Sequence, residues 1–173
     1  MNALETMMDD ISKQITILEC DLYKNTNRYG IYADGHILLE RHMNSRNKKV
    51  ILIEEYLHSK HTQGNILDET DINNKKQENF VRRKNYELLF SSECIIRAYN
   101  LGFTYYHDVA DYFDLPETFI RDAIKHYKKI HGLMWEVGDH VIFLGNYIEV
   151  FKKDTLKTYM IKGDGRKWSQ LVF

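Results

Sequence analysis

Residues 50–68 read VILIEEYLHSKHTQGNILD, an apolar run that is interrupted by two adjacent glutamates. The apolar residues between Val50 and Leu57 nearly surround the axis of a helix, which is typical of a buried central helix. The pattern predicts this helix over about 46–62, with Ser45 as its N-cap. Adjacent carboxylates on a buried helix cost free energy unless an ion or hydrogen bonds compensate them.

Glu54 and His58 are separated by one helical turn, so both side chains project from the same face of this helix. Two such ligands can hold one metal ion, while Glu55 can reach the ion's water without binding the ion itself. With histidine in place of Glu54 the motif would read H-E-x-x-H, the signature of zinc peptidases. A solvated ion pair between Glu54 and His58 is the simpler alternative, and the apolar surroundings argue against it.

A third ligand is expected from a second helix, predicted over about 74–90. Glu78 is the best candidate because it shares a face with apolar residues of that helix, which directs it toward the core. The alternative is that Glu78 only complements the positive end of the helix dipole. His61 follows His58 by one turn and would join the site only if the first helix ended early, so we expect it to be exposed.

The rest of the chain predicts an α+β fold, because helices alternate with a hairpin and then give way to strands. Two short helices around Asp114-Leu115-Pro116 have the pattern of a helix–turn–helix unit. Two further helices are expected over 3–24 and 92–101. A small N-terminal β-hairpin is expected near 30–33 and 36–40, with its turn at Asp34-Gly35. A small C-terminal antiparallel sheet is expected from the segments HVIFLGNYIEVF, TYMI and WSQLVF.

Composition and charge restrict the classes of function. The 24 basic and 25 acidic residues leave a net charge of -1, so the chain has no general attraction for nucleic acid or anionic membranes. No apolar run approaches the roughly 20 residues of a membrane span, and the N-terminus has no secretory core. Cys20 and Cys94 are too far apart for a zinc knuckle. These features predict a cytoplasmic protein with two reduced thiols and no membrane partner.

Residues 5–131 resemble the ImmA/IrrE metallopeptidases of phages and mobile elements. The resemblance rests on YGIYADGHILLE, ILIEEYLHSKHTQGNILD and KKQENFVRRKNYELLF, followed by the helix–turn–helix-like unit. Family members carry histidine or glutamate before E-x-x-H, and an E-x-x-A motif on the next helix. In this chain the first motif falls on Glu54, Glu55 and His58, and the second falls on Glu78 with Val81 in the alanine position.

The resemblance implies a zinc-dependent endopeptidase in which Glu54, His58 and Glu78 hold the metal. Glu55 would be the general base that activates metal-bound water, and no other cofactor is implied. The implied substrate is a cytoplasmic repressor of a phage or mobile element. A non-catalytic protein that binds a repressor or another regulator on the same fold is the alternative, and a DNA-binding regulator is the third interpretation.

The chain departs from the family pattern at several positions. Leu57 stands where glycine is common, and Lys84 and Asn85 replace an aromatic residue and an alanine, which suggests a repacked or partly hydrated third-ligand helix. Glu54 replaces the usual first histidine, so two carboxylates and a neutral imidazole would cancel the charge of a divalent ion. Such a centre polarises a carbonyl less, and its oxygen ligands relax the selection of Zn²⁺ against Mn²⁺.

The expected organisation has three parts: a mostly helical, zincin-like metallopeptidase core over 1–103, the helix–turn–helix-like unit over 104–132, and a β-rich appendage over 133–173. The first helix and turn of the unit carry four acidic residues that DNA phosphates would repel, whereas its second helix is basic. This balance argues against DNA binding and favours a structural or repressor-docking role. His107 and His140 are the histidines considered as transition-state donors in the cleft.

Overall fold

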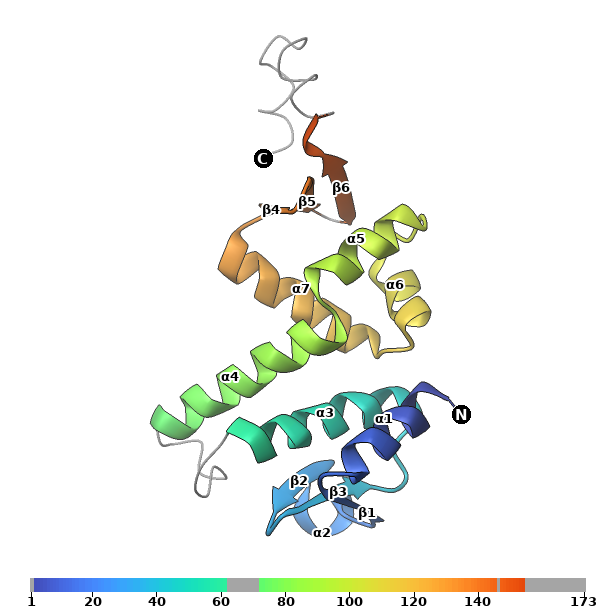
Figure 1. Cartoon of the computed structure of the whole chain (residues 1–173), viewed down its shortest axis with the longest axis vertical. Helices are drawn as coiled ribbons and strands as arrows, with labels where there is room; N and C mark the ends of the chain where they lie inside the picture. The colour runs from blue at the N-terminus through green and yellow to red at the C-terminus, as the bar shows by residue number, and fades with distance from the viewer. Residues whose placement is uncertain (1, 62–71, 146, 155–173) are drawn as a thin grey trace.

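The computed structural model describes residues 2–61, 72–145 and 147–154. Over these residues the fold is α+β and mostly helical, as predicted (Figure 1). The helices are α1 (Ala3–Ser12), α2 (Tyr23–Thr26), α3 (Ser45–His61), α4 (Ile72–Leu89), α5 (Ser92–Asn100), α6 (Tyr106–Phe113) and α7 (Glu117–His131). The strands are β1 (Thr16–Cys20), β2 (Gly30–Ala33), β3 (His36–Glu40), β4 (Met134–Val137), β5 (His140–Leu144) and β6 (Ile148–Lys152).

The first sheet has the order β1-β3-β2 and contains the predicted hairpin. Strands β2 and β3 pair antiparallel around Asp34 and Gly35, whose φ angles of 49° and 76° suit a two-residue hairpin turn. Strand β1 pairs parallel to β3, so the sheet is mixed. The hairpin prediction is therefore confirmed, and the structure adds a third strand to it.

The prediction of one helix over 3–24 is wrong beyond Ser12, because Thr16–Cys20 forms β1. Ile17 packs against the core whereas Leu18 is 47% exposed, which is the alternation of a strand. Short apolar runs do not distinguish a helix from a strand by spacing alone. Pairing with β3, which is distant in sequence, decides the conformation of this segment.

Helix α3 is the central helix that the sequence predicts. It lies against the first sheet with α1 beside it, and α4 packs along its other side (Figure 1). Leu52 and Leu57 belong to a buried cluster with Ile37 of β3 and Val81 of α4. The helix begins at Ser45, and the side chain of Asn44 accepts a hydrogen bond from the Asn47 N–H at 2.9 Å, so the cap precedes the predicted one.

A second hydrophobic cluster joins α5, α6, α7, the end of α4 and the antiparallel sheet β4-β5-β6. Helix α4 contributes Val81 to the first cluster and Tyr86 to the second. The antiparallel β4–β6 sheet agrees with the predicted C-terminal sheet, but TYMI (158–161) and WSQLVF (168–173) lie outside the described residues. The division into three parts stays a prediction. None of the helices in the described ranges combines the length and apolar character needed to cross a bilayer.

An ion-pair cluster connects the start of α3 to the end of α6. Arg46 pairs with Asp111 at 2.7 Å and with Asp114 at 2.9 Å, and Lys49 pairs with Asp114 at 2.6 Å. The side chain of Lys49 is 4% exposed and that of Asp114 is 52% exposed. Hydrogen bonds from Lys49 and Arg46 lower the pKa of Asp114. Two of the acidic residues that would repel DNA therefore have an internal role.

We expect Asp114→Asn to cost more stability than Lys49→Met. The first change leaves a buried ammonium without its carboxylate, whereas the second leaves a half-exposed carboxylate that water and Arg46 still solvate. After allowance for the exposure of Asp114, the expected loss for Asp114→Asn is about 1–2 kcal/mol. Chemical denaturation measures both variants and the double variant, and a larger loss for Lys49→Met would contradict this assignment.

The same cluster has a defined pH dependence. Because folding lowers the pKa of Asp114, its contribution is present above the ordinary carboxyl pKa and is lost as the pH falls through the folded-state value. The difference in stability between wild type and Asp114→Asn should therefore shrink in acid.

Candidate metal centre

The structure brings together the three residues that the sequence proposes as metal ligands. Glu54 and His58 come from α3 and Glu78 comes from α4, and one ligand atom of each lies within 4.8 Å of the others. The Nε2 atom of His58 is 3.5 Å from a carboxylate oxygen of Glu78. Donor atoms that bind one tetrahedral ion at about 2.0–2.2 Å lie roughly 3.5 Å apart. This pair matches that spacing, and rotamer adjustment of Glu54 would complete the set.

His58 is in the protonation state that a metal ligand requires. Burial, together with the smaller effects of the charges of Arg28 and Arg82, lowers its pKa to about 4. The imidazole is therefore neutral at pH 7, and its approach to Glu78 is not an ion pair under those conditions. A neutral ring nitrogen and a carboxylate face the same space, which is the arrangement that a divalent cation can occupy.

Burial dominates the electrostatics of the two glutamates on α3. It raises the pKa of Glu54, against an opposing effect from Arg82 and with a small reinforcement from Glu78. Burial, followed by the charge of Glu54, raises the pKa of Glu55 to about 8. At pH 7 the carboxyl of Glu55 therefore favours its protonated form without a cation, and a divalent ion beside the two glutamates would favour their charged forms. The donor set and its burial thus fit a divalent metal.

Glu55 lies beside the three convergent residues but is not one of them. The backbone N–H of Tyr32 in β2 lowers the pKa of Glu55, against the effect of burial. A Cβ atom added at Gly30 would lie 2.8 Å from Oε1 of Glu55 and 2.3 Å from a methyl group of Ile51. Strand β2 therefore approaches α3 closely enough to fix Glu55, and only glycine permits this approach.

A cleft of about 570 Å³ opens beside the metal centre. Its walls come from α3, α4, the start of α7 and the loop after β3. Among the three candidate ligands Glu54 lines this cleft, together with Asn47, Arg82, Phe119 and Asp122. The cleft therefore reaches the group of convergent residues at Glu54.

Asn85 is a polar residue of α4 that is only 2% exposed. Its Nδ2 atom donates to the backbone oxygen of Val50 at 3.1 Å, which joins α4 to α3 one turn before Glu54. Its Oδ1 atom is buried and has no hydrogen-bond partner in the described part of the chain. The preceding residue, Lys84, pairs with Glu87 on the surface at 2.7 Å. Asn85 therefore contributes a polar contact between α3 and α4.

The other histidines considered from sequence do not join the site. His61 is exposed at the end of α3, and its ring meets that of Phe80 edge-on at 5.3 Å. His107 and His140 pair with their neighbours Asp108 and Asp139, and neither lines the cleft described above. Sequence reasoning missed Arg28 and Arg82, the two cations whose charges act on the centre. The spacing of four residues between Glu78 and Arg82 could have indicated that Arg82 shares a helix face with the candidate ligand.

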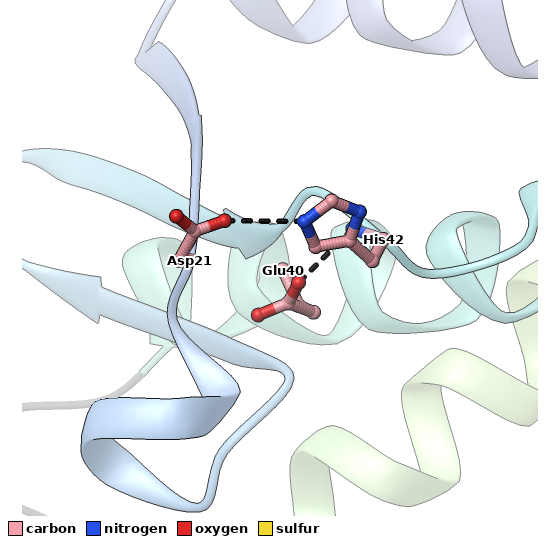
Figure 2. A group of neighbouring side chains, drawn as sticks. All are labelled: Asp21, Glu40 and His42. Atoms are coloured by element: carbon pink, nitrogen blue, oxygen red, sulfur yellow. Dashed lines mark hydrogen bonds and ion pairs between the residues drawn. The ribbon is translucent and has the colours of Figure 1, made fainter.

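Asp21, Glu40 and His42 form a second group of potential ligands (Figure 2). The carboxylate of Glu40 accepts the Tyr23 N–H at 2.8 Å and the His42 N–H at 3.0 Å, and these bonds lower its pKa, His42 having the larger effect. Asp21 contacts His42 at 3.3 Å and Arg41 at 3.2 Å. Both carboxylate oxygens of Glu40 already accept hydrogen bonds from backbone N–H groups. Asp21, Glu40 and His42 therefore connect the loops that follow β1 and β3.

Comparison with known proteins gave no match. No family model, no curated protein and no solved structure matches this chain. The geometry, burial and charge of the centre on α3 and α4 are therefore the basis of the functional proposal.

Proposed function

We propose that this chain is a metal-dependent endopeptidase of the ImmA/IrrE type that acts in the cytoplasm. Its substrate is a repressor protein of a phage or mobile element. The observation that supports the proposal is the convergence of Glu54, His58 and Glu78 beside the buried carboxyl group of Glu55. Adjacent buried carboxyls with raised pKa values, next to a neutral imidazole, are typical of a functional site.

Each residue of the site would have a separate role in the reaction. Glu54, His58 and Glu78 hold the ion, with zinc preferred and manganese as the alternative. When bound, such an ion polarises a peptide carbonyl and acidifies water. Glu55 would take a proton from the attacking water and give it to the leaving amine, and the close approach of β2 at Gly30 would keep its side chain in place. The cleft beside Glu54 admits the polypeptide.

A second candidate is a non-catalytic protein that binds a repressor on the same surface. Glu54 in place of a neutral histidine favours this alternative, because it makes the loaded centre formally neutral and a weaker electrophile. DNA binding is not part of the proposal, since the net charge of -1 gives the chain no general attraction for nucleic acid.

Metal analysis and cleavage of the cognate repressor test the proposal together. The purified chain, after dialysis against zinc or manganese, should contain about one ion and should cut the repressor encoded beside it at a discrete bond identified by mass spectrometry. A chain that takes up neither ion would refute the metal site. A loaded chain that binds the repressor tightly but leaves it intact would establish the non-catalytic alternative.

A further inference from the structure

Arg82 has no role in the motif, but its position relates it to the metal centre. It follows Glu78 by one turn of α4, so both side chains leave the helix on the same face. It lines the cleft together with Glu54. Its charge also acts on Glu54 and His58, two of the three candidate ligands. The guanidinium group therefore lies on the side of the centre that a substrate approaches.

Arg82 is also available to a ligand, in contrast to its neighbour on the same helix. Arg83 pairs with Glu87 at 3.7 Å and lies over the ring of Phe80 at 5.2 Å. Arg82 is exposed and forms no hydrogen bond or ion pair with any residue in the described ranges. An arginine that lines a cleft without a protein partner can present several N–H donors to a bound oxygen.

The charge of the ligand set explains why such a cation is needed. Peptide hydrolysis places negative charge on the carbonyl oxygen in the transition state, and fixed positive groups near that oxygen lower the barrier. Two glutamates and a neutral histidine cancel the charge of a divalent ion, whereas two histidines and one carboxylate would leave about +1. The positive charge that Glu54 removes from the ligand set is present again on Arg82.

We propose that Arg82 is a catalytic residue of this centre, which donates hydrogen bonds to the carbonyl oxygen of the scissile peptide as that oxygen becomes negative. The inference rests on the proposed peptidase function. It assigns to Arg82 the role that sequence analysis considered for His107 and His140, whose side chains pair elsewhere.

The proposal predicts effects of opposite sign on metal affinity and on cleavage. Arg82→Gln removes a positive charge next to a divalent ion, so zinc should bind roughly 3- to 10-fold more tightly. The same change removes a donor to the developing negative charge, so kcat should fall about 10²-fold with a smaller change in KM. A residue with only a structural role would weaken both properties when it is replaced.

Two matched variants control the experiment. Arg83→Gln changes the adjacent arginine, which faces Glu87, and should leave zinc affinity and kcat near the wild-type values. Arg82→Lys keeps the positive charge but loses the planar set of guanidinium N–H donors. Its zinc affinity should therefore match that of wild type, and its kcat should lie between those of wild type and Arg82→Gln. Circular dichroism and denaturation of the metal-free chains show whether each variant is folded.

Calorimetry provides a readout that does not require cleavage. Acetohydroxamic acid loses a proton when it binds zinc and then presents an anionic oxygen, so it should bind the zinc-loaded wild type about 10-fold more tightly than zinc-loaded Arg82→Gln. Failure of the wild type to bind zinc would refute the proposed function itself. With zinc bound, equal kcat for wild type and Arg82→Gln, or weaker zinc binding and unchanged acetohydroxamate binding in the variant, would refute the role of Arg82 alone.

Discussion

Replacing His58 with alanine should abolish metal loading. The imidazole is buried, neutral and 3.5 Å from Glu78, and it is the nitrogen donor of the convergent group. Without it two carboxylates from different helices remain, and too few protein ligands are left for a stable site. We expect less than about a tenth of the zinc content of wild type after identical dialysis, with cleavage lost in parallel.

His61→Ala is the matched control for this experiment. His61 is on the same helix, but it is exposed and lies against Phe80, so its loss should leave metal content unchanged. Because the loss of a buried side chain can reduce stability, Glu78→Gln should be measured as well, and it should weaken zinc binding without opening a cavity. Full metal retention in His58→Ala, or loss of metal in His61→Ala, would reject the ligand assignment.

Local patterns predicted the parts of the fold that depend on neighbouring residues. The Asp34-Gly35 hairpin follows from turn chemistry, and Glu54 and His58 share a face because helical spacing requires it. Glu78 could be assigned to the same centre because its helix has an apolar face that must turn inward. In the structure a carboxylate oxygen of Glu78 lies 3.5 Å from Nε2 of His58, across the contact between α4 and α3.

Features that depend on distant pairing could not be predicted in this way. Strand β1 exists because it pairs with β3 about 20 residues later, and its apolar spacing alone suits a helix equally well. The ion pairs of Arg46 and Lys49 connect residues that are 65 to 68 positions apart. The position of Arg82 over the cleft also depends on how α4 crosses α3, which spacing within one helix does not specify.

Replacing Glu55 with glutamine should separate catalysis from metal binding. Glutamine has nearly the same size as glutamate, so the close approach of β2 to α3 at Gly30 should be retained. Glu55 is not among the convergent ligands, and zinc content should therefore remain near that of wild type. Because glutamine cannot accept a proton from water, we expect repressor cleavage to fall roughly 10²–10⁴-fold.

The metal-free protein provides a second measurement on the same variant. Folding raises the pKa of Glu55 to about 8, so the folded chain binds more protons than the unfolded chain between the ordinary carboxyl value and that pH. The contribution of Glu55 to the stability of the metal-free protein should therefore fall as the pH rises through this window, so the difference in stability between wild type and Glu55→Gln should change with pH in this direction. If the curves of stability against pH run parallel for wild type and Glu55→Gln, then folding does not raise the pKa of Glu55. Equal repressor cleavage by wild type and Glu55→Gln at matched zinc content would show that Glu55 is not the general base.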